Sequence, residues 1–141
     1  MDIDYPPTQT YTLGAAAERE RKRAASLDSD DDRREHETAR NQADALAWAA
    51  TQWGEDGEIT LSAYTARTRG RIQDTLRTQV MGDPGADEST VWFVAGAIDD
   101  APWIDETDLT DKAEATGQLP PALVDWLAAE LEELNDLSEG N

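Results

Sequence analysis

The stretch LPPALVDWLAAELEELNDL, residues 119–137, carries the clearest helical pattern in the chain. Its leucines recur every three or four residues, which places them on one face of an α-helix; they are Leu123, Leu127, Leu131 and Leu134. The two prolines suit a first helical turn, where a missing N–H group has no partner in any case. We therefore expect an amphipathic helix that packs its apolar face against earlier segments or a partner chain, with Trp126 at the edge of that face.

The composition is strongly acidic, with 31 Asp and Glu against 12 Lys and Arg and a net charge of −19. Such a balance is typical of proteins that work in molar salt, where the Debye length is ~3 Å and like charges stop repelling. We expect a halophilic source; an ordinary acidic protein or a disordered acidic chain is the alternative. The negative charge also argues against direct binding of nucleic acid, which requires cations facing the phosphates.

The residue types for catalysis or cofactor binding are scarce. The chain has no cysteine, so disulfides and thiolate metal sites are excluded. The single histidine, His36, lies in a charged stretch with no nucleophile or second histidine at a useful spacing. No apolar run approaches the ~20 residues of a membrane span, and the first residues do not form a signal peptide. We therefore expect a non-enzymatic protein without metal, cofactor or membrane contact.

The periodicity predicts a mainly α-helical fold, a small multi-helix domain with at most one short strand or hairpin. Residues 1–13 are expected to form an extended arm, and residues 14–56 a helical segment with an acidic break at 26–32. Residues 57–137 are expected to form the helical core domain, with a strand at 58–61 and a tail at 138–141. Within that domain, helices are expected at 66–81 and 87–98, with a buried strand as the alternative for the second. An acidic connector from Ile104 to Gly117 leads to the last helix.

Two parts of the chain are candidate partner contacts. The arm carries apolar side chains that either fray or lie along a neighbouring chain; they are Ile3, Tyr5, Tyr11 and Leu13. Arg67 and Arg71 stand one helical turn apart, with Arg69 and Arg77 nearby. This basic patch is either a solvated face paired with local carboxylates or a docking face for an acidic partner.

Three pieces of the chain resemble the tail assembly chaperones of long-tailed, siphovirus-like viruses of bacteria and archaea. EITLSAYTARTRGRIQD, from residue 58, is similar to the family's opening strand, its Leu/Thr turn and its Arg-rich helix. VWFVAGAIDDAPW, from residue 91, is similar to its central apolar helix and acidic turn. The acidic DETDL and the closing LPPALVDWLAAELEELNDL are similar to its last segment. The resemblance covers about residues 57–137.

The resemblance implies a morphogenesis protein that binds the tape measure and tail tube proteins in the host cytoplasm during assembly, with a haloarchaeal host. On this interpretation, Trp103 and Trp126 are the expected partner contacts. An alternative is a structural component of the virion neck or capsid, such as a head–tail adaptor that binds portal and neck proteins in a homo-oligomeric ring. A third interpretation is a free cytosolic protein of a halophile that binds a small partner.

Overall fold

A computed structural model describes residues 7–27, 33–79, 86–105 and 108–139. Six helices dominate these ranges, so the prediction of a mainly α-helical fold is confirmed. A small antiparallel sheet accompanies them, formed by β1 (Thr8–Thr12), β2 (Glu58–Ser62) and β3 (Ile98–Asp100) in that spatial order. The sheet therefore has one strand more than the single hairpin that the sequence predicts.

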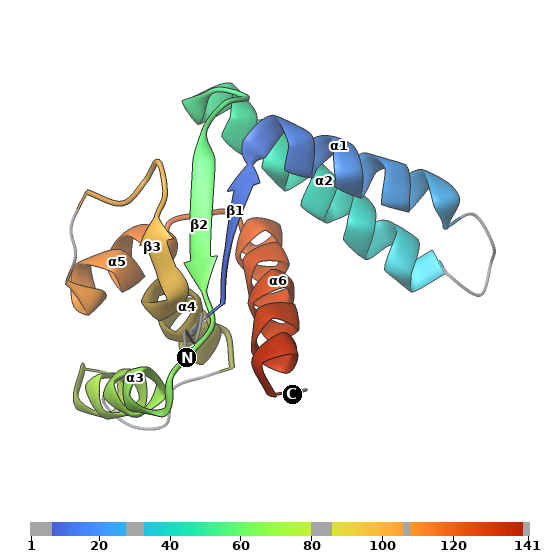
Figure 1. Ribbon diagram of the computed structural model, residues 1–141. Helices are drawn as coiled ribbons and strands as arrows, with labels where there is room; N and C mark the ends of the chain where they lie inside the picture. The colour runs from blue at the N-terminus through green and yellow to red at the C-terminus, as the bar shows by residue number, and fades with distance from the viewer. Residues whose placement is uncertain (1–6, 28–32, 80–85, 106–107, 140–141) are drawn as a thin grey trace, which may run out of the picture.

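The first half of the chain forms a helical hairpin of α1 (Leu13–Ser26) and α2 (Arg33–Trp53). The two helices pack through small alanine side chains, among them Ala39 and Ala43 of α2, which are both buried. The imidazole of His36 donates from Nδ1 to the carbonyl oxygen of Ala24 at 2.7 Å, which links α2 to the last turn of α1. The hairpin projects beyond the rest of the molecule (Figure 1).

β1 corrects the prediction of a free N-terminal arm. It pairs with β2 along its whole length, with Thr8 opposite Ser62 and Thr12 opposite Glu58. Leu13, the residue that begins α1, is fully buried. The pairing joins residues about fifty positions apart, so local periodicity cannot reveal it. Ile3 and Tyr5 lie outside the described residues.

The second half supplies α3 (Ala66–Gln79), α4 (Ala86–Ala97), α5 (Leu109–Thr116) and α6 (Pro121–Glu139). The hydroxyl oxygen of Thr65 accepts a hydrogen bond from the N–H of Thr68 at 3.1 Å and so caps α3, which begins one residue later. The connector predicted from Ile104 to Gly117 contains α5, whose buried Ala113 and Thr116 are three positions apart. The helix predicted at 87–98 ends at Ala97, and Ile98 begins β3.

One core spans both halves of the chain. Ile59 and Leu61 of β2 pack with Leu123 and Leu127 of α6, and Leu46 of α2 belongs to the same buried cluster. The separate domain expected at 57–137 therefore shares its core with the segment expected at 14–56. A second cluster joins α3 to α4 and α6. The leucine stripe of α6 is buried as the sequence predicts, at Leu123, Leu127, Leu131 and Leu134.

β2 separates two ends of the molecule, because α2 ends before it and α3 begins after it. β3 runs antiparallel to β2, with Asp100 opposite Thr60, so the chain that follows β3 returns to the end where α2 finishes. Figure 1 shows α3 at the bottom and the end of α2 at the top, with the sheet between them.

Candidate functional site

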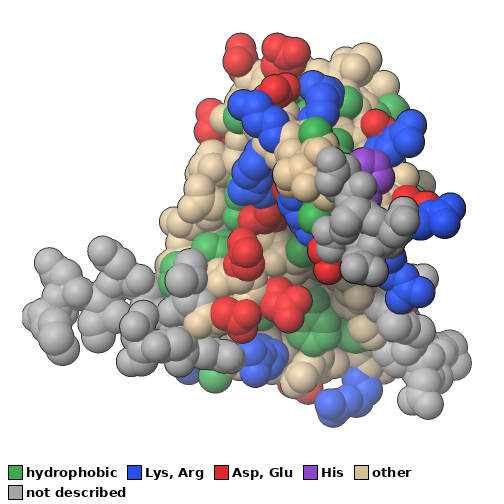
Figure 2. Space-filling model, turned by 90° about the vertical axis from the view of Figure 1, so that its right-hand side faces the viewer, with side chains coloured by type: hydrophobic (Ala, Val, Ile, Leu, Met, Phe, Trp, Pro, Cys, Tyr) green, Lys and Arg blue, Asp and Glu red, His purple; other side chains and the backbone are tan. Residues whose placement is uncertain are grey.

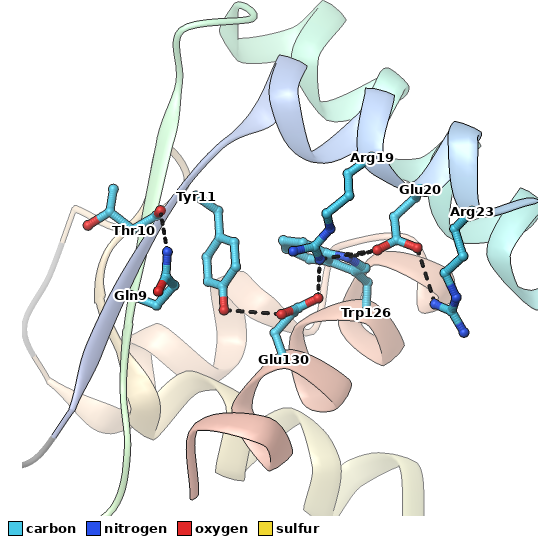
Figure 3. Close-up of polar contacts among 8 residues, drawn as sticks. All are labelled: Gln9, Thr10, Tyr11, Arg19, Glu20, Arg23, Trp126 and Glu130. Atoms are coloured by element: carbon cyan, nitrogen blue, oxygen red, sulfur yellow. Dashed lines mark hydrogen bonds and ion pairs between the residues drawn. The ribbon is translucent and has the colours of Figure 1, made fainter. Parts of the chain in front are cut away.

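Polar side chains gather where α1 crosses α6, around the carboxylate of Glu20 (Figure 3). Glu20 is 2% exposed. Its Oε1 accepts a hydrogen bond from the indole Nε1 of Trp126 at 3.1 Å and one from Nη2 of Arg19, also at 3.1 Å. Its Oε2 accepts from Nη1 of Arg23 at 3.2 Å. A buried carboxylate is stable in such a place because several donors replace its lost hydration.

A second buried carboxylate, Glu130 of α6, completes this group, which we call the carboxylate cluster. Glu130 is 8% exposed and accepts hydrogen bonds from the Arg19 guanidinium and from the Tyr11 hydroxyl, the latter at 3.2 Å. Arg19 therefore bridges the two carboxylates and lies over the Trp126 ring, with Cζ 5.9 Å from the ring centroid. Tyr11 meets the same ring edge to face at 5.2 Å. The cluster thus joins β1, α1 and α6.

The electrostatics of the cluster keep its donors protonated. Burial raises the pKa of Tyr11 above its ordinary value, and the negative charge of Glu130 and the hydrogen bond to it raise the pKa further. Burial alone would lower the pKa of Arg19, but the carboxylates of Glu130 and Glu20 outweigh that effect and the pKa is raised. Both side chains therefore stay hydrogen-bond donors at neutral pH. The arrangement fixes α1 against α6, and an open hollow of about 480 Å³ borders it, lined in part by Arg23 and Glu133.

A row of three tryptophans lies at the end of the molecule where α2 finishes, and we call it the tryptophan row. Trp48 is 41% exposed, and its ring centroid lies 5.5 Å from that of Trp53, nearly perpendicular to it. Trp53 in turn lies 5.3 Å from Trp103, which follows β3. The Trp103 Nε1 donates to the hydroxyl of Thr116 at 3.4 Å. Internal contacts thus hold Trp53 and Trp103 in place, while Trp48 presents its ring to solvent.

The arginines of α3 form an exposed surface at the opposite end, which we call the arginine face. Arg67 and Arg71 are exposed, and no carboxylate of the described residues is within ion-pair distance of either. Arg77 lies 3.9 Å from the carboxylate of Asp74, a loose pair between exposed side chains. Ile72 and Leu76 attach the other face of α3 to α4. Within the ranges that the structure describes, Arg77 therefore has a local carboxylate partner, and Arg67 and Arg71 have none.

The structure separates the predicted contact residues into two groups. Arg67 and Arg71 are on the surface, and Trp103 is half-buried within the tryptophan row. Trp126 is 1% exposed and Leu13 is fully buried, so neither can be a surface contact in this fold. Tyr11 also points inward, onto Trp126 and Glu130. Trp126 was expected at the edge of the apolar face, but α1 and β1 cover that edge.

The sequence reasoning missed five residues that matter here: Arg19, Glu20, Glu130, Trp48 and Trp53. One signal was present for Glu130, because it stands three positions after Leu127 and four before Leu134 and so falls on the apolar face of its helix. A carboxylate at such a position predicts a buried partner. Trp48 and Trp53 stand five positions apart on α2, but no local signal in the sequence indicates Trp103, which reaches them only through the return of β3.

Comparison of the chain with protein-family models, with curated proteins and with solved structures finds no match. No helix in the described part of the chain has the length and apolarity needed to cross a membrane. Across the same ranges, no group of three or more His, Cys, Asp or Glu side chains is arranged to hold a metal ion.

Proposed function

We propose that this protein is a non-enzymatic docking protein of tailed-virus assembly, of the tail-assembly-chaperone kind, working at high salt. The observation that carries the proposal is that one group of polar and aromatic side chains is engaged inside the fold while another group is exposed to solvent. The carboxylate cluster is engaged inside the fold, whereas Trp48, Arg67 and Arg71 are presented to solvent on elements that the core holds in place. Exposed Trp and Arg are the side chains most enriched in protein–protein hot spots.

The proposed partners are proteins rather than nucleic acid, because a chain of net charge −19 repels phosphates. Figure 2 shows one face of the molecule, where Lys and Arg are interspersed with Asp and Glu over the hairpin and α6, without a continuous basic track. The tape measure and tail tube proteins are the partners that the resemblance implies, and the host cytoplasm is the proposed site of action.

The head–tail adaptor is the competing proposal. An adaptor in a ring would lay its terminal arm across a neighbouring subunit, whereas residues 8–12 of the arm pair with β2 of the same chain. The free cytosolic interaction protein is the third proposal, and the same experiment separates all three.

The experiment is quantitative mass spectrometry of purified virus particles and of infected cells, with an affinity tag on this protein. A chaperone co-purifies with tail proteins from infected cells and is missing from finished particles. An adaptor is present in particles at a fixed copy number. Recovery without any virion protein from either source would exclude both viral roles. A parallel purification with Arg67→Glu/Arg71→Glu, against Arg33→Glu/Arg34→Glu on the hairpin as control, tests whether the arginine face takes part.

A further inference from the structure

The two exposed surfaces have opposite electrostatic character. The tryptophan row belongs to two stretches, residues 41–66 and 78–111, that contain no Lys or Arg. Asp44 precedes Trp48 by one helical turn, and Asp105 follows Trp103 by two positions; both carboxylates are exposed. The arginine face comes from the intervening residues 67–77, which carry four Arg against one Asp. The chain thus has an acidic aromatic surface and a separate cationic surface.

These surfaces cannot satisfy each other within one molecule. β2 lies between them, with the end of α2 before it and the start of α3 after it. A strand of five residues extends about 17 Å, so the two surfaces lie at opposite ends of the sheet. The arginine face and the tryptophan row can therefore contact each other only between two copies of the protein.

We propose that this protein associates head to tail with a second copy of itself, the arginine face of one copy docking on the tryptophan row of the next. Guanidinium groups stack on the faces of indole rings and pair with neighbouring carboxylates. Arg67 and Arg71 stand one turn apart and are both free of ion pairs within the described residues, so they are available for such contacts. The proposal rests on the proposed function, since it names one partner of the same docking surfaces.

An interface of this kind is heterologous, because each copy contributes a different surface. Repetition of the contact builds a closed ring or an open filament rather than a two-fold dimer. Each copy in a row then has one occupied arginine face and one occupied tryptophan row, and the two terminal copies each keep one surface free.

Sedimentation velocity of the full chain over a wide range of protein concentration tests the proposal. The wild type should show a weight-average mass that rises with concentration. Arg67→Glu/Arg71→Glu and Trp48→Ala should each lose that rise and remain monomeric. An equimolar mixture of the two variants should form a one-to-one dimer and nothing larger, because each variant retains the surface that the other lacks. Arg33→Glu/Arg34→Glu, the matched charge reversal on the hairpin, should behave as wild type.

Several results would overturn the proposal. A wild type that stays monomeric at every concentration would contradict it. Self-association of either variant alone would also contradict it, because such a contact does not need both surfaces and indicates a two-fold interface. A mixture that fails to dimerise would also contradict it, provided that circular dichroism shows both variants folded. Asp44→Arg/Asp105→Arg reverses the charge of the tryptophan row without touching a ring, and it should abolish association if Trp48→Ala proves unfolded.

The outcome is separable from that of the proposed function. A monomeric wild type that still co-purifies with tail proteins would end this inference and leave the proposed function standing. Self-assembly of a protein that co-purifies with no viral partner would support this inference and contradict the proposed function.

Discussion

The carboxylate of Glu20 on α1 accepts the indole N–H of Trp126 on α6, across 106 positions of sequence. The bond is part of the boundary between the helical hairpin and the closing helix, and both groups are almost fully buried. Glu20 supplies the acceptor for the buried N–H of Trp126, and it also accepts from Arg19 and Arg23. The stability of the whole fold should therefore depend on this pair.

Glu20→Ala should lower the free energy of unfolding by ~3–5 kcal/mol, because it leaves the buried N–H of Trp126 and the guanidinium of Arg23 without their acceptor and leaves Arg19 with Glu130 alone. Glu20→Gln retains an oxygen for Trp126 and should cost less. Urea unfolding followed by Trp fluorescence measures both. Glu18→Ala, on an exposed residue of the same helix, is the control and should change little. Equal losses for Glu20→Ala and Glu18→Ala would mean that the buried bonds contribute nothing.

Ile72 of α3 packs directly over Gly96 of α4. A Cβ built on Gly96 would lie 2.9 Å from Cγ1 of Ile72 and closer still to its Cδ1. Gly96→Ala should therefore destabilise the fold by ~1–3 kcal/mol through overpacking. Ile72→Val removes the obstructing Cδ1 and should cost ~0.5–1.5 kcal/mol alone.

The two Gly96 and Ile72 changes together should cost less than the sum of the single changes, because the methyl group of one fills space vacated by the other. Chemical denaturation of the four proteins of this double-mutant cycle gives the coupling directly. Strict additivity would show that α3 does not pack on α4 at this point.

Stability should fall at alkaline pH because of Tyr11. Its pKa is raised in the folded state, so the folded chain keeps a proton that the unfolded chain loses near pH ~10. The contribution is fully present below that pH and is lost as the pH rises toward the folded value. Tyr11→Phe should be less stable than wild type at neutral pH by about 1 kcal/mol, through the lost bond to Glu130.

The comparison that tests the Tyr11 effect is urea unfolding of both proteins near pH ~8 and pH ~11, on either side of the ordinary phenol pKa. Tyr11→Phe should lose less stability between the two conditions than wild type. Tyr64, whose pKa burial also raises, is present in both proteins and cancels. Parallel losses would remove Tyr11 from the explanation.

The two possible truncations of the N-terminus should have opposite effects. Removal of residues 1–6 leaves β1 intact and should preserve the fold. Removal of residues 1–13 deletes β1 together with Leu13, which packs in the main core, and should abolish the cooperative transition. Thermal melts of the two truncated chains, followed by circular dichroism, make the distinction. A folded 7–141 and a folded 14–141 would together show that β1 is dispensable.

The fold should also require salt. From residue 79 onward the chain carries 16 carboxylates and one cation, Lys112, whose ammonium donates to the carbonyl oxygen of Ile98 at 2.8 Å. Mutual repulsion among these carboxylates should destabilise the compact state when screening is weak. Helical ellipticity should therefore rise between low and multimolar KCl. A constant signal across that range would exclude a halophilic adaptation.

The spacing of apolar residues along the sequence predicted those helices and that strand whose buried face is set by their own sequence. The leucine spacing marks the buried face of α6 at Leu123 and Leu127, the strand expected at 58–61 is β2, and the helix expected from residue 66 is α3. What could not be predicted depends on pairing between distant segments. β1 appears extended and free until β2 is placed beside it, and a three-residue strand such as β3 has no periodicity of its own.

The candidate surfaces divide in the same way. Arg67 and Arg71 could be found because their spacing along one helix is visible in the sequence. Trp126 was expected at the surface because the apolar residues of α6 define a single buried face beside it. The sequence of α6 does not show that α1 and β1 cover the adjacent face as well. Trp48 and Trp53 lie on the same helix, and only a tertiary contact adds Trp103 to the row.

The strand order has a consequence for how the chain acquires its structure during synthesis. β1 and α1 leave the ribosome well before β2 and long before α6, yet Leu13 and Glu20 find their burial against those later elements. The hairpin can form early, because its two helices are adjacent in sequence, but its inner face stays open to water until α6 arrives. Charged side chains lie on that inner face; they are Arg19, Glu20 and Arg23. These charged groups keep the inner face of the hairpin hydrated while the nascent chain is incomplete. The face is buried when α6, with Trp126, packs against it.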